Sequence, residues 1–432
     1  MKEGGIGLAK QIKNNKPMKF KLMGFISDDA EIKHHYLMGT KVYTPDMNTI
    51  KTMRNNNIST LLISPGAIAG FRANKDFQDA LLAEGIHIYM PTTQEWNRNE
   101  QQQLKEVSIE DLLPRDEISI DMESVGSMLH GKRILITGSA GSIGSEMVRQ
   151  IAKYSPAELI LIDSAETPQH DIRLMMAKQF PDIKAETIVT TICSKSRMEH
   201  IFKTYLPDYV FHAAAYKHVP MMENNPCESI QNNVYGTKIL ADLAVKYGVK
   251  KFVMISTDKA VNPTNVMGCS KRICEIYVQS LNKAIEEGII NGKTQFVTTR
   301  FGNVLGSNGS VIPLFKKQIK AGGPVTVTDP RIIRYFMLIP EACKLVLEAV
   351  TKGNGGEIFV FDMGKPVKIA DMAQRMINLS GAKNVEIKYT GLRAGEKLYE
   401  EVLNEKESTK PSFHDKIRIA EVREYDYTEV SK

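Results

Sequence analysis

An acid and a base stand side by side at Asp258 and Lys259, directly after the apolar stretch Phe252-Val-Met-Ile255. Short apolar stretches of this kind are typical of buried parallel strands, so we predict that the pair lies where a strand ends. Lys271 follows Met267 by four residues, which would place both side chains on one face of a helix. A thioether carries no proton that could be transferred. Either this site is inactive, or Asp258 and Lys259 carry out its proton chemistry.

A glycine-rich loop follows the apolar stretch 132–137 and precedes a helical stretch that runs to Ile151. Three glycines at this spacing let the backbone turn tightly, approach a pyrophosphate and pack the helix against the strand, while the helix N-terminus supplies free N–H groups. The glycine spacing alone is weak evidence, but the strand-loop-helix context makes it specific. The predicted cofactor contacts in this loop are Gly138, Ser139, Gly141, Ser142, Ile143 and Gly144.

Two further segments fit a bound dinucleotide. Asp163 ends the next apolar stretch, 159–162, where a carboxylate would accept both ribose hydroxyls of NAD and repel the 2′-phosphate of NADP. Capping of a helix is the alternative role for Asp163, and Glu166 is a weaker candidate for the ribose. Ala213 and Ala214 follow another strand and are small enough for a nicotinamide ribose to lie against. The predicted cofactor is therefore NAD.

Alternating strand and helix patterns run from residue 131 to about residue 300, with candidate strands at 132–137, 159–162, 209–211, 252–255 and 296–299. This order predicts an α/β fold with a doubly wound parallel sheet of the Rossmann type. After Pro313 the pattern is mixed, and we expect a small C-terminal substrate-binding part there, mainly from residue 300 onward.

The first hundred residues predict a second, smaller α/β unit, with apolar stretches at 20–26, 60–64 and 86–90. Gly4-Gly-Ile-Gly7 resembles the end of a phosphate loop whose strand is missing, so we expect the chain to begin inside a domain. Residues 92–130 are polar and predict a connector. The predicted organisation is a truncated Rossmann-like domain over 1–95, a linker over 96–130 and a catalytic domain over 131–432.

Composition excludes several classes of function. Lys and Arg number 56 against 50 Asp and Glu, a mild excess that suits an anionic small substrate but is too diffuse for a nucleic-acid partner. No apolar run approaches the roughly 20 residues of a membrane helix. The five cysteines form no Cys-x-x-Cys pair and no cluster with zinc spacing. We therefore expect reduced thiols in a cytoplasmic protein and no metal.

The remaining motifs resemble a known family. They include Ser256-Thr-Asp-Lys259, Arg300-Phe-Gly-Asn-Val-Leu-Gly-Ser307, Arg334-Tyr-Phe-Met337 and Gly391-Leu-Arg-Ala-Gly-Glu-Lys397. With the glycine loop they resemble the large nucleotide-sugar 4,6-dehydratases of the extended short-chain dehydrogenase/reductase group, the polysaccharide-biosynthesis proteins acting on UDP-N-acetylglucosamine. The resemblance covers nearly the whole chain, is densest over 131–404 and extends to a linker at 109–115. The superfamily usually has Tyr at the position of Met267, and the membrane-attached branch has Met.

The resemblance implies an NAD-dependent hydro-lyase. C4 of the sugar is oxidised, Lys259 removes the proton on C5, Asp258 protonates the departing C6 hydroxyl, and hydride returns to C6. Thr257 would orient the C4 hydroxyl, and Lys271 would hold the nicotinamide ribose. The implied catalytic set is Thr257, Asp258, Lys259, Met267 and Lys271, and the implied substrate contacts are Lys217, Asn303, Arg334 and Arg393. A full-length form would be attached to the cytoplasmic face of the inner membrane, and we expect a homo-oligomer.

Two positions depart from the family pattern. Thr191 stands where the family has an Asp near the adenine, and Ile333 precedes Arg334 where the family has Thr. Three alternatives stay open: a nucleotide-sugar 4-epimerase, a C5-inverting dehydratase, and a non-catalytic NAD-binding scaffold. The base for the C4 hydroxyl is also open, with Lys259 or a water relay as the candidates.

Overall fold

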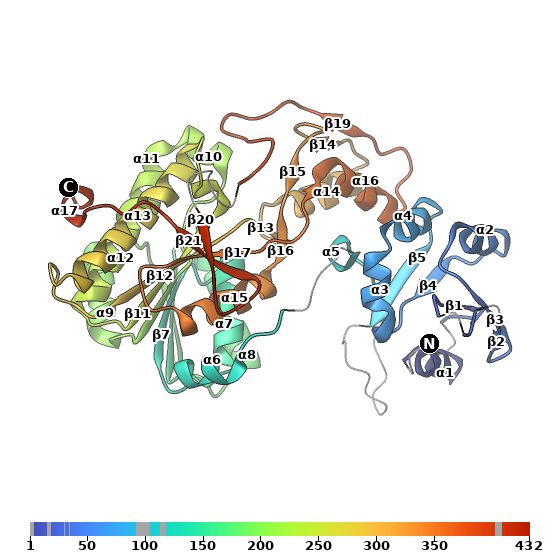
Figure 1. The fold of residues 1–432 in the computed structure, drawn as a ribbon, viewed down its shortest axis with the longest axis horizontal. Helices are drawn as coiled ribbons and strands as arrows, with labels where there is room; N and C mark the ends of the chain where they lie inside the picture. Colours follow the sequence, from blue (N-terminus) through green and yellow to red (C-terminus); the bar gives the residue numbers. More distant parts are fainter. Residues whose placement is uncertain are drawn as a thin grey trace. The chain divides into compact units, whose positions relative to one another are not determined.

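The computed structural model describes residues 4–14, 19–29, 31–33, 35–91, 104–112, 118–401 and 408–432. The chain divides into two compact units (Figure 1). One unit comprises residues 1–117, 314–327 and 370–388, and the other comprises 118–313, 328–369 and 389–432. We call them the N-terminal unit and the catalytic unit. Two segments that the sequence placed in the substrate-binding part, 314–327 and 370–388, therefore belong to the N-terminal unit.

A nine-stranded sheet forms the centre of the catalytic unit, in the order β20-β21-β17-β12-β11-β10-β7-β8-β9. The strands from β9 to β17 are parallel, and β21 and β20 close one edge in antiparallel fashion. The order reverses between β7 and β10, which is the switch point where doubly wound sheets bind ligands. The strands are β7 Arg133–Thr137, β8 Glu158–Asp163, β9 Ala185–Val189, β10 Tyr209–His212, β11 Lys251–Thr257, β12 Gln295–Phe301, β17 Ile358–Phe361, β20 Ser408–Pro411 and β21 Ile417–Glu421.

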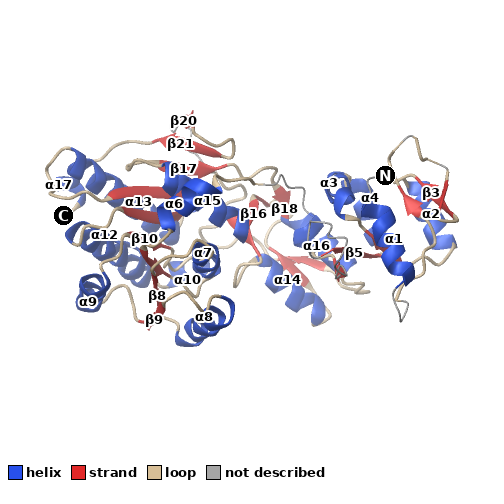
Figure 2. Ribbon diagram, turned by 90° about the horizontal axis from the view of Figure 1, so that it is seen from below, coloured by secondary structure: helices blue, strands red, loops and turns tan. Residues whose placement is uncertain are grey.

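Helices cover both faces of this sheet, as a doubly wound fold requires (Figure 2). One face packs against α6 Met122–Leu129, α7 Ser142–Ala152, α8 Glu166–Gln179 and α15 Ile339–Lys352. The other packs against α9 Lys195–Tyr205, α12 Gly236–Lys246 and α13 Val266–Glu286. The α/β fold class predicted from the sequence is confirmed, and all five candidate strands are present.

Shorter elements complete the catalytic unit. Strands β13 and β16 pair in parallel, and β15 and β18 pair in antiparallel fashion. The elements are α10 Val219–Asn224, α11 Pro226–Ser229, a π-helical segment Ile230–Tyr235, a 3-10 turn Asp258–Ala260, β13 Asn303–Leu305, β15 Ile333–Arg334, β16 Phe336–Leu338, β18 Val367–Lys368 and α17 Tyr427–Val430.

The predicted linker over 96–130 is not one connector in the residues that the structure describes. Helix α6 begins after the N-cap Asp121 and buries Val125 and Leu129 completely in the core of the catalytic unit. Further back, β6 pairs with β5 in the N-terminal unit. The polar composition concealed both elements because a short amphipathic helix needs only two or three apolar residues to reach a core. Residues 92–103 and 113–117, including the end of the predicted linker motif at 113–115, lie outside the described residues.

The N-terminal unit is itself an α/β structure whose described residues form three small sheets, β1-β3-β2, β4-β5-β6 and β14-β19. Its elements are α1 Gly4–Asn14, β1 Phe25–Ile26, β2 Tyr36–Leu37, β3 Thr40–Tyr43, α2 Met47–Asn55, β4 Thr60–Leu62, a 3-10 turn Pro65–Ala67, α3 Ile68–Ala73, α4 Lys75–Ala83, β5 His87–Pro91, β6 Leu104–Glu106 and α5 Ile109–Leu112. The segments 314–327 and 370–388 of this unit mostly form α14 Val311–Lys320, β14 Val325–Val327, α16 Ile369–Leu379 and β19 Ile387–Tyr389.

Three details of the N-terminal unit differ from the sequence prediction. Only Phe25–Ile26 of the stretch 20–26 forms a strand, and the strand predicted over 86–90 runs from His87 to Pro91 as β5. Gly4 to Gly7 form the first turn of α1 rather than a loop.

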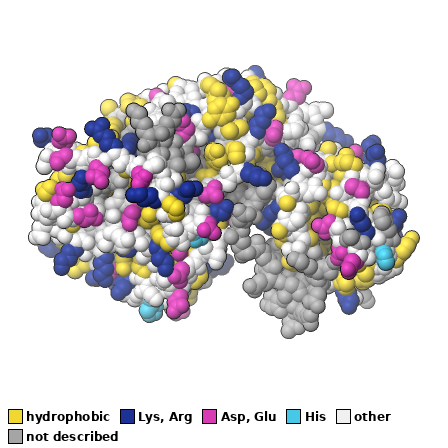
Figure 3. All heavy atoms as spheres, in the orientation of Figure 1, with side chains coloured by type: hydrophobic (Ala, Val, Ile, Leu, Met, Phe, Trp, Pro, Cys, Tyr) yellow, Lys and Arg dark blue, Asp and Glu magenta, His cyan; other side chains and the backbone are white. Residues whose placement is uncertain are grey.

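Within the described ranges, no helix has the length and apolar character needed to cross a bilayer. On the face drawn in Figure 3, basic and acidic side chains are interspersed.

Candidate active site

The glycine loop joins β7 to α7 at the switch point of the sheet. Gly138 has a φ of +68°, and a Cβ there would lie 2.7 Å from the backbone nitrogen of Ala214. A Cβ at Gly144 would lie 1.9 Å from the Gly138 carbonyl oxygen. A Cβ at Gly141, by contrast, would meet only that same oxygen, at 3.2 Å. The first and third glycines are therefore needed by the protein's own packing, and the second leaves an open approach to the loop.

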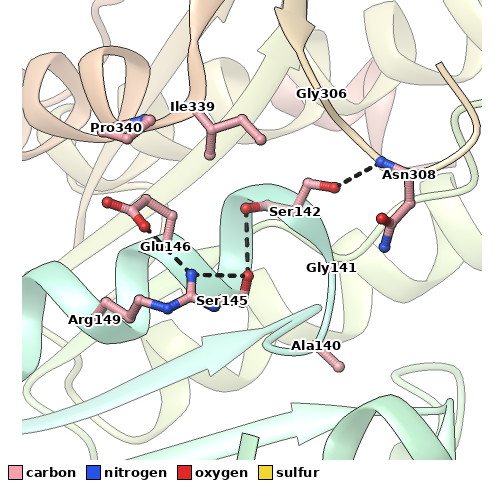
Figure 4. Close-up of a pocket in the computed structure, with 10 residues that line it drawn as sticks. All are labelled: Ala140, Gly141, Ser142, Ser145, Glu146, Arg149, Gly306, Asn308, Ile339 and Pro340. Carbon is pink, nitrogen blue, oxygen red and sulfur yellow. Dashed lines mark hydrogen bonds and ion pairs between the residues drawn. The ribbon is translucent and has the colours of Figure 1, made fainter. Parts of the chain in front are cut away.

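The N-terminus of α7 is available to an anion. Its N-cap is Gly141, no side chain caps it, and no acidic residue lies in its first turn. A pocket of about 400 Å³ adjoins this turn and is bounded by the loop after β13 and the start of α15 (Figure 4). Within it, the backbone N–H of Asn308 donates to Ser142 Oγ at 3.1 Å, and Arg149 lies beside Ser145. Free N–H groups and a helix dipole at such a site favour a phosphate group.

The other predicted cofactor residues surround this loop, with one exception. Asp163 Oδ2 accepts a hydrogen bond from the Ala140 N–H at 3.0 Å, so the carboxylate lies against the loop, and the N-cap of α8 is Ala165 instead. Ala213 and Ala214 lie against Gly138. Ser139 is completely buried, and its hydroxyl donates to Gln169 at 2.8 Å. Its side chain therefore tethers the loop to α8 and does not face a cofactor.

Asp258 and Lys259 form a 3-10 turn directly after β11, where the sequence placed them. Asp258 is 1% exposed. Its Oδ1 accepts from the Thr257 hydroxyl at 2.8 Å and from Lys259 Nζ at 3.0 Å. Its Oδ2 is buried and has no hydrogen-bond partner among the described residues. A buried carboxylate oxygen without a partner is costly until it meets a donor, so Oδ2 is open to a hydrogen-bond donor of a bound ligand.

The side-chain nitrogen of Lys259 has three acceptors around it. Besides Asp258 Oδ1, Asn303 Oδ1 lies at 3.3 Å and Glu400 Oε1 at 3.5 Å. Burial alone would lower the pKa of Lys259, but the charges of Asp258 and Glu400 overcome it, and the pKa is raised above its ordinary value. The structure therefore holds Lys259 as an ammonium ion, whereas the predicted mechanism needs it neutral. Glu400 was not predicted from the sequence, although it lies three residues beyond the motif that ends at Lys397.

Helix α13 packs closely against the turn that carries Asp258 and Lys259. A Cβ at Gly268 would lie 2.2 Å from the Lys259 carbonyl oxygen, so this glycine permits the helix to touch the turn. Met267 and Lys271 both lie on α13 and are 3% and 5% exposed. Burial lowers the pKa of Lys271, partly offset by Cys274 and Glu275. The predicted helical spacing of Met267 and Lys271 is confirmed.

His212 connects the glycine loop with the region of Lys271. The His212 ring is completely buried and hydrogen-bonds the hydroxyls of Thr137 and Thr237, each at 2.8 Å. Burial, and secondly the charge of Lys271, lower the pKa of His212 to about 3. Thr137 directly precedes Gly138, so this neutral histidine joins the glycine loop to the region of Lys271.

Three of the four predicted substrate contacts have side chains that a ligand could reach or that lie beside the acid–base pair. Asn303 contacts Lys259, and Arg393 is exposed. Lys217 is solvent-exposed, yet partial burial and the charge of Lys259 lower its pKa, so these two cations face one region. Such a pair favours an anionic group between them.

Arg334, predicted as a substrate contact, has its donors occupied by the protein itself in this structure. It is 8% exposed, Nη1 donates to the carbonyl oxygens of Ile333 and Leu398, and Nη2 donates to that of Lys397. Its Nε lies 3.7 Å from Glu400 Oε1. In this conformation Arg334 clamps the segment 397–400 and has no donor directed at a phosphate.

Two buried features behind the turn had only weak signals in the sequence. Asn233 lies in the π-helical segment, where its side chain bonds both backbone groups of Tyr216, and such segments occur often at functional sites. Arg300 and Glu275 form a completely buried ion pair at 2.8 Å, and Glu275 also accepts from the Ser256 hydroxyl. This pair ties α13 to β11 and β12.

The parallel sheet, the glycine loop at its switch point and the Asp-Lys pair with Lys271 on the next helix define a dinucleotide-binding enzyme domain of the short-chain dehydrogenase/reductase type. Across the described part of the chain, no three His, Cys, Asp or Glu side chains gather as metal ligands.

Comparison with known proteins gives the family. A family model described as "Polysaccharide biosynthesis protein" matches residues 134–422. The chain is 42% identical to the capsular polysaccharide biosynthesis protein CapD of Staphylococcus aureus, over 99% of this chain and 72% of that protein. The chain belongs to this polysaccharide biosynthesis family.

Two relatives carry named activities. A UDP-N-acetylglucosamine 4,6-dehydratase (inverting) of Campylobacter jejuni is 36% identical over 65% of this chain and 80% of its own length. A UDP-glucose 4-epimerase of Rickettsia canadensis is 35% identical over 66% of this chain and 81% of its own length. The similarity places the chain among enzymes that act on nucleotide sugars, and identity alone does not separate dehydration from epimerisation.

Proposed function

We propose that this protein is a hydro-lyase that removes water from a UDP-N-acetylhexosamine, UDP-N-acetylglucosamine, to give the 4-keto-6-deoxy sugar. The observation that carries the proposal is the Asp258-Lys259 pair, with a buried, unpartnered Asp258 Oδ2 beside a lysine nitrogen at the end of β11. NAD is the proposed cofactor, and when bound it would oxidise C4 and return the same hydride to C6. The free N-terminus of α7 and the open approach at Gly141 fit its pyrophosphate.

The two side chains divide the elimination between them. Loss of water breaks the C5–H bond and the C6–O bond and leaves a double bond between the two carbons. Lys259 Nζ takes the C5 proton, and the proton on Asp258 Oδ2 goes to the departing C6 hydroxyl. Thr257, which donates to Asp258 Oδ1, keeps the other oxygen occupied, so a proton on Asp258 belongs on Oδ2.

A 4-epimerase is the second candidate, since one relative bears that name. An epimerase reduces the 4-keto sugar again at C4 and needs neither a base at C5 nor an acid at C6. Burial of a carboxylic acid beside a lysine serves no step of that reaction. The geometry therefore favours elimination. The predicted homo-oligomer and the membrane attachment of a full-length form stay predictions, and inversion at C5 stays an alternative.

Incubation with UDP-N-acetylglucosamine and NAD, followed by mass spectrometry, tests the proposal. A product lighter by one water supports dehydration, an isobaric product supports epimerisation, and unchanged substrate supports a scaffold. In deuterated water the product should carry deuterium at C5 in the wild type.

Lys259→Ala should abolish both product and deuterium incorporation, because no other described lysine nitrogen contacts Asp258. Lys250→Ala is the matched control, since Lys250 is exposed, lies at the opposite end of β11 and pairs with Asp208. Normal turnover in Lys259→Ala would refute the role of this residue.

A further inference from the structure

Glu400 stands between two cations of the candidate site. Its side chain is 6% exposed, its Oε1 lies 3.5 Å from Lys259 Nζ, and the same oxygen lies 3.7 Å from Arg334 Nε. Removing a carboxylate from water is costly unless charges or hydrogen bonds replace the lost solvation. The charges of Lys259 and Arg334 therefore replace part of the solvation that the Glu400 carboxylate loses on burial.

Three oxygen atoms surround the side-chain nitrogen of Lys259, two as hydrogen-bond acceptors and one as an ion-pair partner. An ammonium group has three N–H donors and no acceptor. Lys259 Nζ has three oxygen neighbours, on Asp258, Asn303 and Glu400, at 3.0, 3.3 and 3.5 Å. The arrangement matches a protonated amine, and an amine in this state has no lone pair to accept a proton from a substrate.

We propose that Glu400 is a positioning residue that holds Lys259 as an ammonium ion in the resting site, so that Lys259 becomes a base only after it has released one proton to solvent. The proposal rests on the proposed function for its catalytic meaning. Arg334 sets the place of Glu400, because its Nη1 and Nη2 donors hold the carbonyl oxygens of Lys397 and Leu398. The segment 397–400 is thereby a second support for the acid–base pair, independent of β11 and α13.

Four charged groups face Lys259. Asp258 on the turn and Glu400 on the segment 397–400 favour its charged form, and Arg334 on β15 opposes it. Lys217, in the loop after β10, is also close enough for the two charges to affect each other. Neutralising Glu400 leaves one carboxylate against two cations. The neutral amine should then become much more frequent at a given pH.

The test compares Glu400→Gln with Glu401→Gln. Glutamine keeps the shape of the side chain and removes its charge. Glu401 is the matched control because it is adjacent, exposed and paired with Lys397 instead of Lys259. Each protein is labelled without substrate by an amine-acetylating reagent from pH 7 to pH 10, and peptide mass spectrometry follows Lys259 against the exposed Lys250. Only the neutral amine reacts, so the labelling rate reports its fraction.

In Glu400→Gln, acetylation of Lys259 at pH 8 should rise by about tenfold or more, because an opposite charge this close shifts such an equilibrium by about one pH unit or more. The labelling profile should also level off at a lower pH than in the wild type. A change of exposure alone would multiply the rate without moving that plateau. Glu401→Gln should match the wild type, and Glu400→Asp, whose charge is retained but drawn back, should fall between.

The same variants are then assayed for deuterium exchange at C5 of the sugar. The pH at which exchange reaches half its maximum should fall by about one unit or more in Glu400→Gln. Unchanged labelling of Lys259 in both Glu400 variants would overturn the proposal. If the labelling shifts while the wild type releases no dehydrated product, the positioning role stands and the proposed function fails. If Glu400→Gln does not fold, Glu400→Asp alone decides, since it must still shift the labelling profile.

Discussion

A substitution at Gly141, the second glycine of the loop, should weaken cofactor binding without destabilising the fold. Gly141 has φ −73° and ψ 169°, which any residue adopts, and a Cβ there would meet only the Gly138 carbonyl oxygen at 3.2 Å. Alanine restricts the unfolded chain and so stabilises by about 0.4–1 kcal/mol, while a poorer N-cap costs a similar amount. Gly141→Ala should therefore leave the free energy of unfolding within about 1 kcal/mol of the wild type.

Gly144→Ala is the contrasting variant. Its Cβ would lie 1.9 Å from the Gly138 carbonyl oxygen, and ordinary contact begins near 3.4 Å, so loop and helix must separate by about 1.5 Å. Overpacking of this kind costs about 1–3 kcal/mol, which lowers Tm by roughly 3–10 °C in a domain of this size. Both the fold and the cofactor site should suffer.

Thermal unfolding without cofactor and calorimetric titration with NAD measure the two effects separately. For Gly141→Ala we expect a Tm close to that of the wild type and an NAD affinity at least about tenfold weaker, because the methyl group fills the space where a pyrophosphate approaches the α7 N-terminus. For Gly144→Ala both quantities should fall. Wild-type NAD affinity in Gly141→Ala would refute the placement of the pyrophosphate at this turn.

Two further predictions concern groups behind the site. His212 has a pKa of about 3 in the folded protein against an ordinary 6.5, so only the unfolded chain gains its proton between these values, and the free energy of unfolding should fall by about 1.4 kcal/mol per pH unit below pH 6.5. Urea unfolding at pH 7 and pH 5.5 measures this slope, and a slope of equal size in His212→Gln would contradict the assignment. Gly268→Ala should lower turnover by at least about tenfold with NAD affinity unchanged, because its Cβ would lie 2.2 Å from the Lys259 carbonyl oxygen and displace the acid–base turn. Gly70→Ala, whose Cβ meets nothing within 4 Å, is the matched control, and normal turnover in Gly268→Ala would exclude this coupling.

Local sequence signals were sufficient for the five adjacent parallel strands β8, β7, β10, β11 and β12 and for the site residues that directly follow or precede one another on their elements. The buried strands are short apolar runs, and their order along the chain dictates which carboxyl ends meet at one edge. Asp258 and Lys259 could be placed because they directly follow such a strand, and Met267 and Lys271 because they are four residues apart on a helix. Each of these inferences needed only neighbouring residues.

Long-range packing could not be predicted in this way. Glu400 reaches Lys259 from a segment far along the chain, and no periodicity marks it as a partner. Arg334 was predicted to contact the substrate, yet carbonyl groups of the segment 397–400 occupy its donors. Ser139 lies in a motif that was predicted to contact the cofactor, and its burial against Gln169 depends on how α8 packs. Strand β9 escaped notice because its residues are only partly buried and lack a continuous apolar run.

The methionine at position 267 is compatible with an active site because nothing that places the acid–base pair depends on it. Asp258 and Lys259 are held by β11, by the close approach of Gly268 and by Glu400. Met267 contributes a buried apolar side chain to the same helix, and Lys271 keeps its position one turn later. What a tyrosine would have supplied is a single proton acceptor for the C4 hydroxyl. Three oxygens surround Lys259 Nζ in the resting site. That acceptor is therefore either a water molecule or Lys259 itself after it has lost a proton. In the second case, oxidation at C4 and elimination at C5 draw on the same nitrogen, and the carboxylate of Glu400 sets the pH at which both can begin.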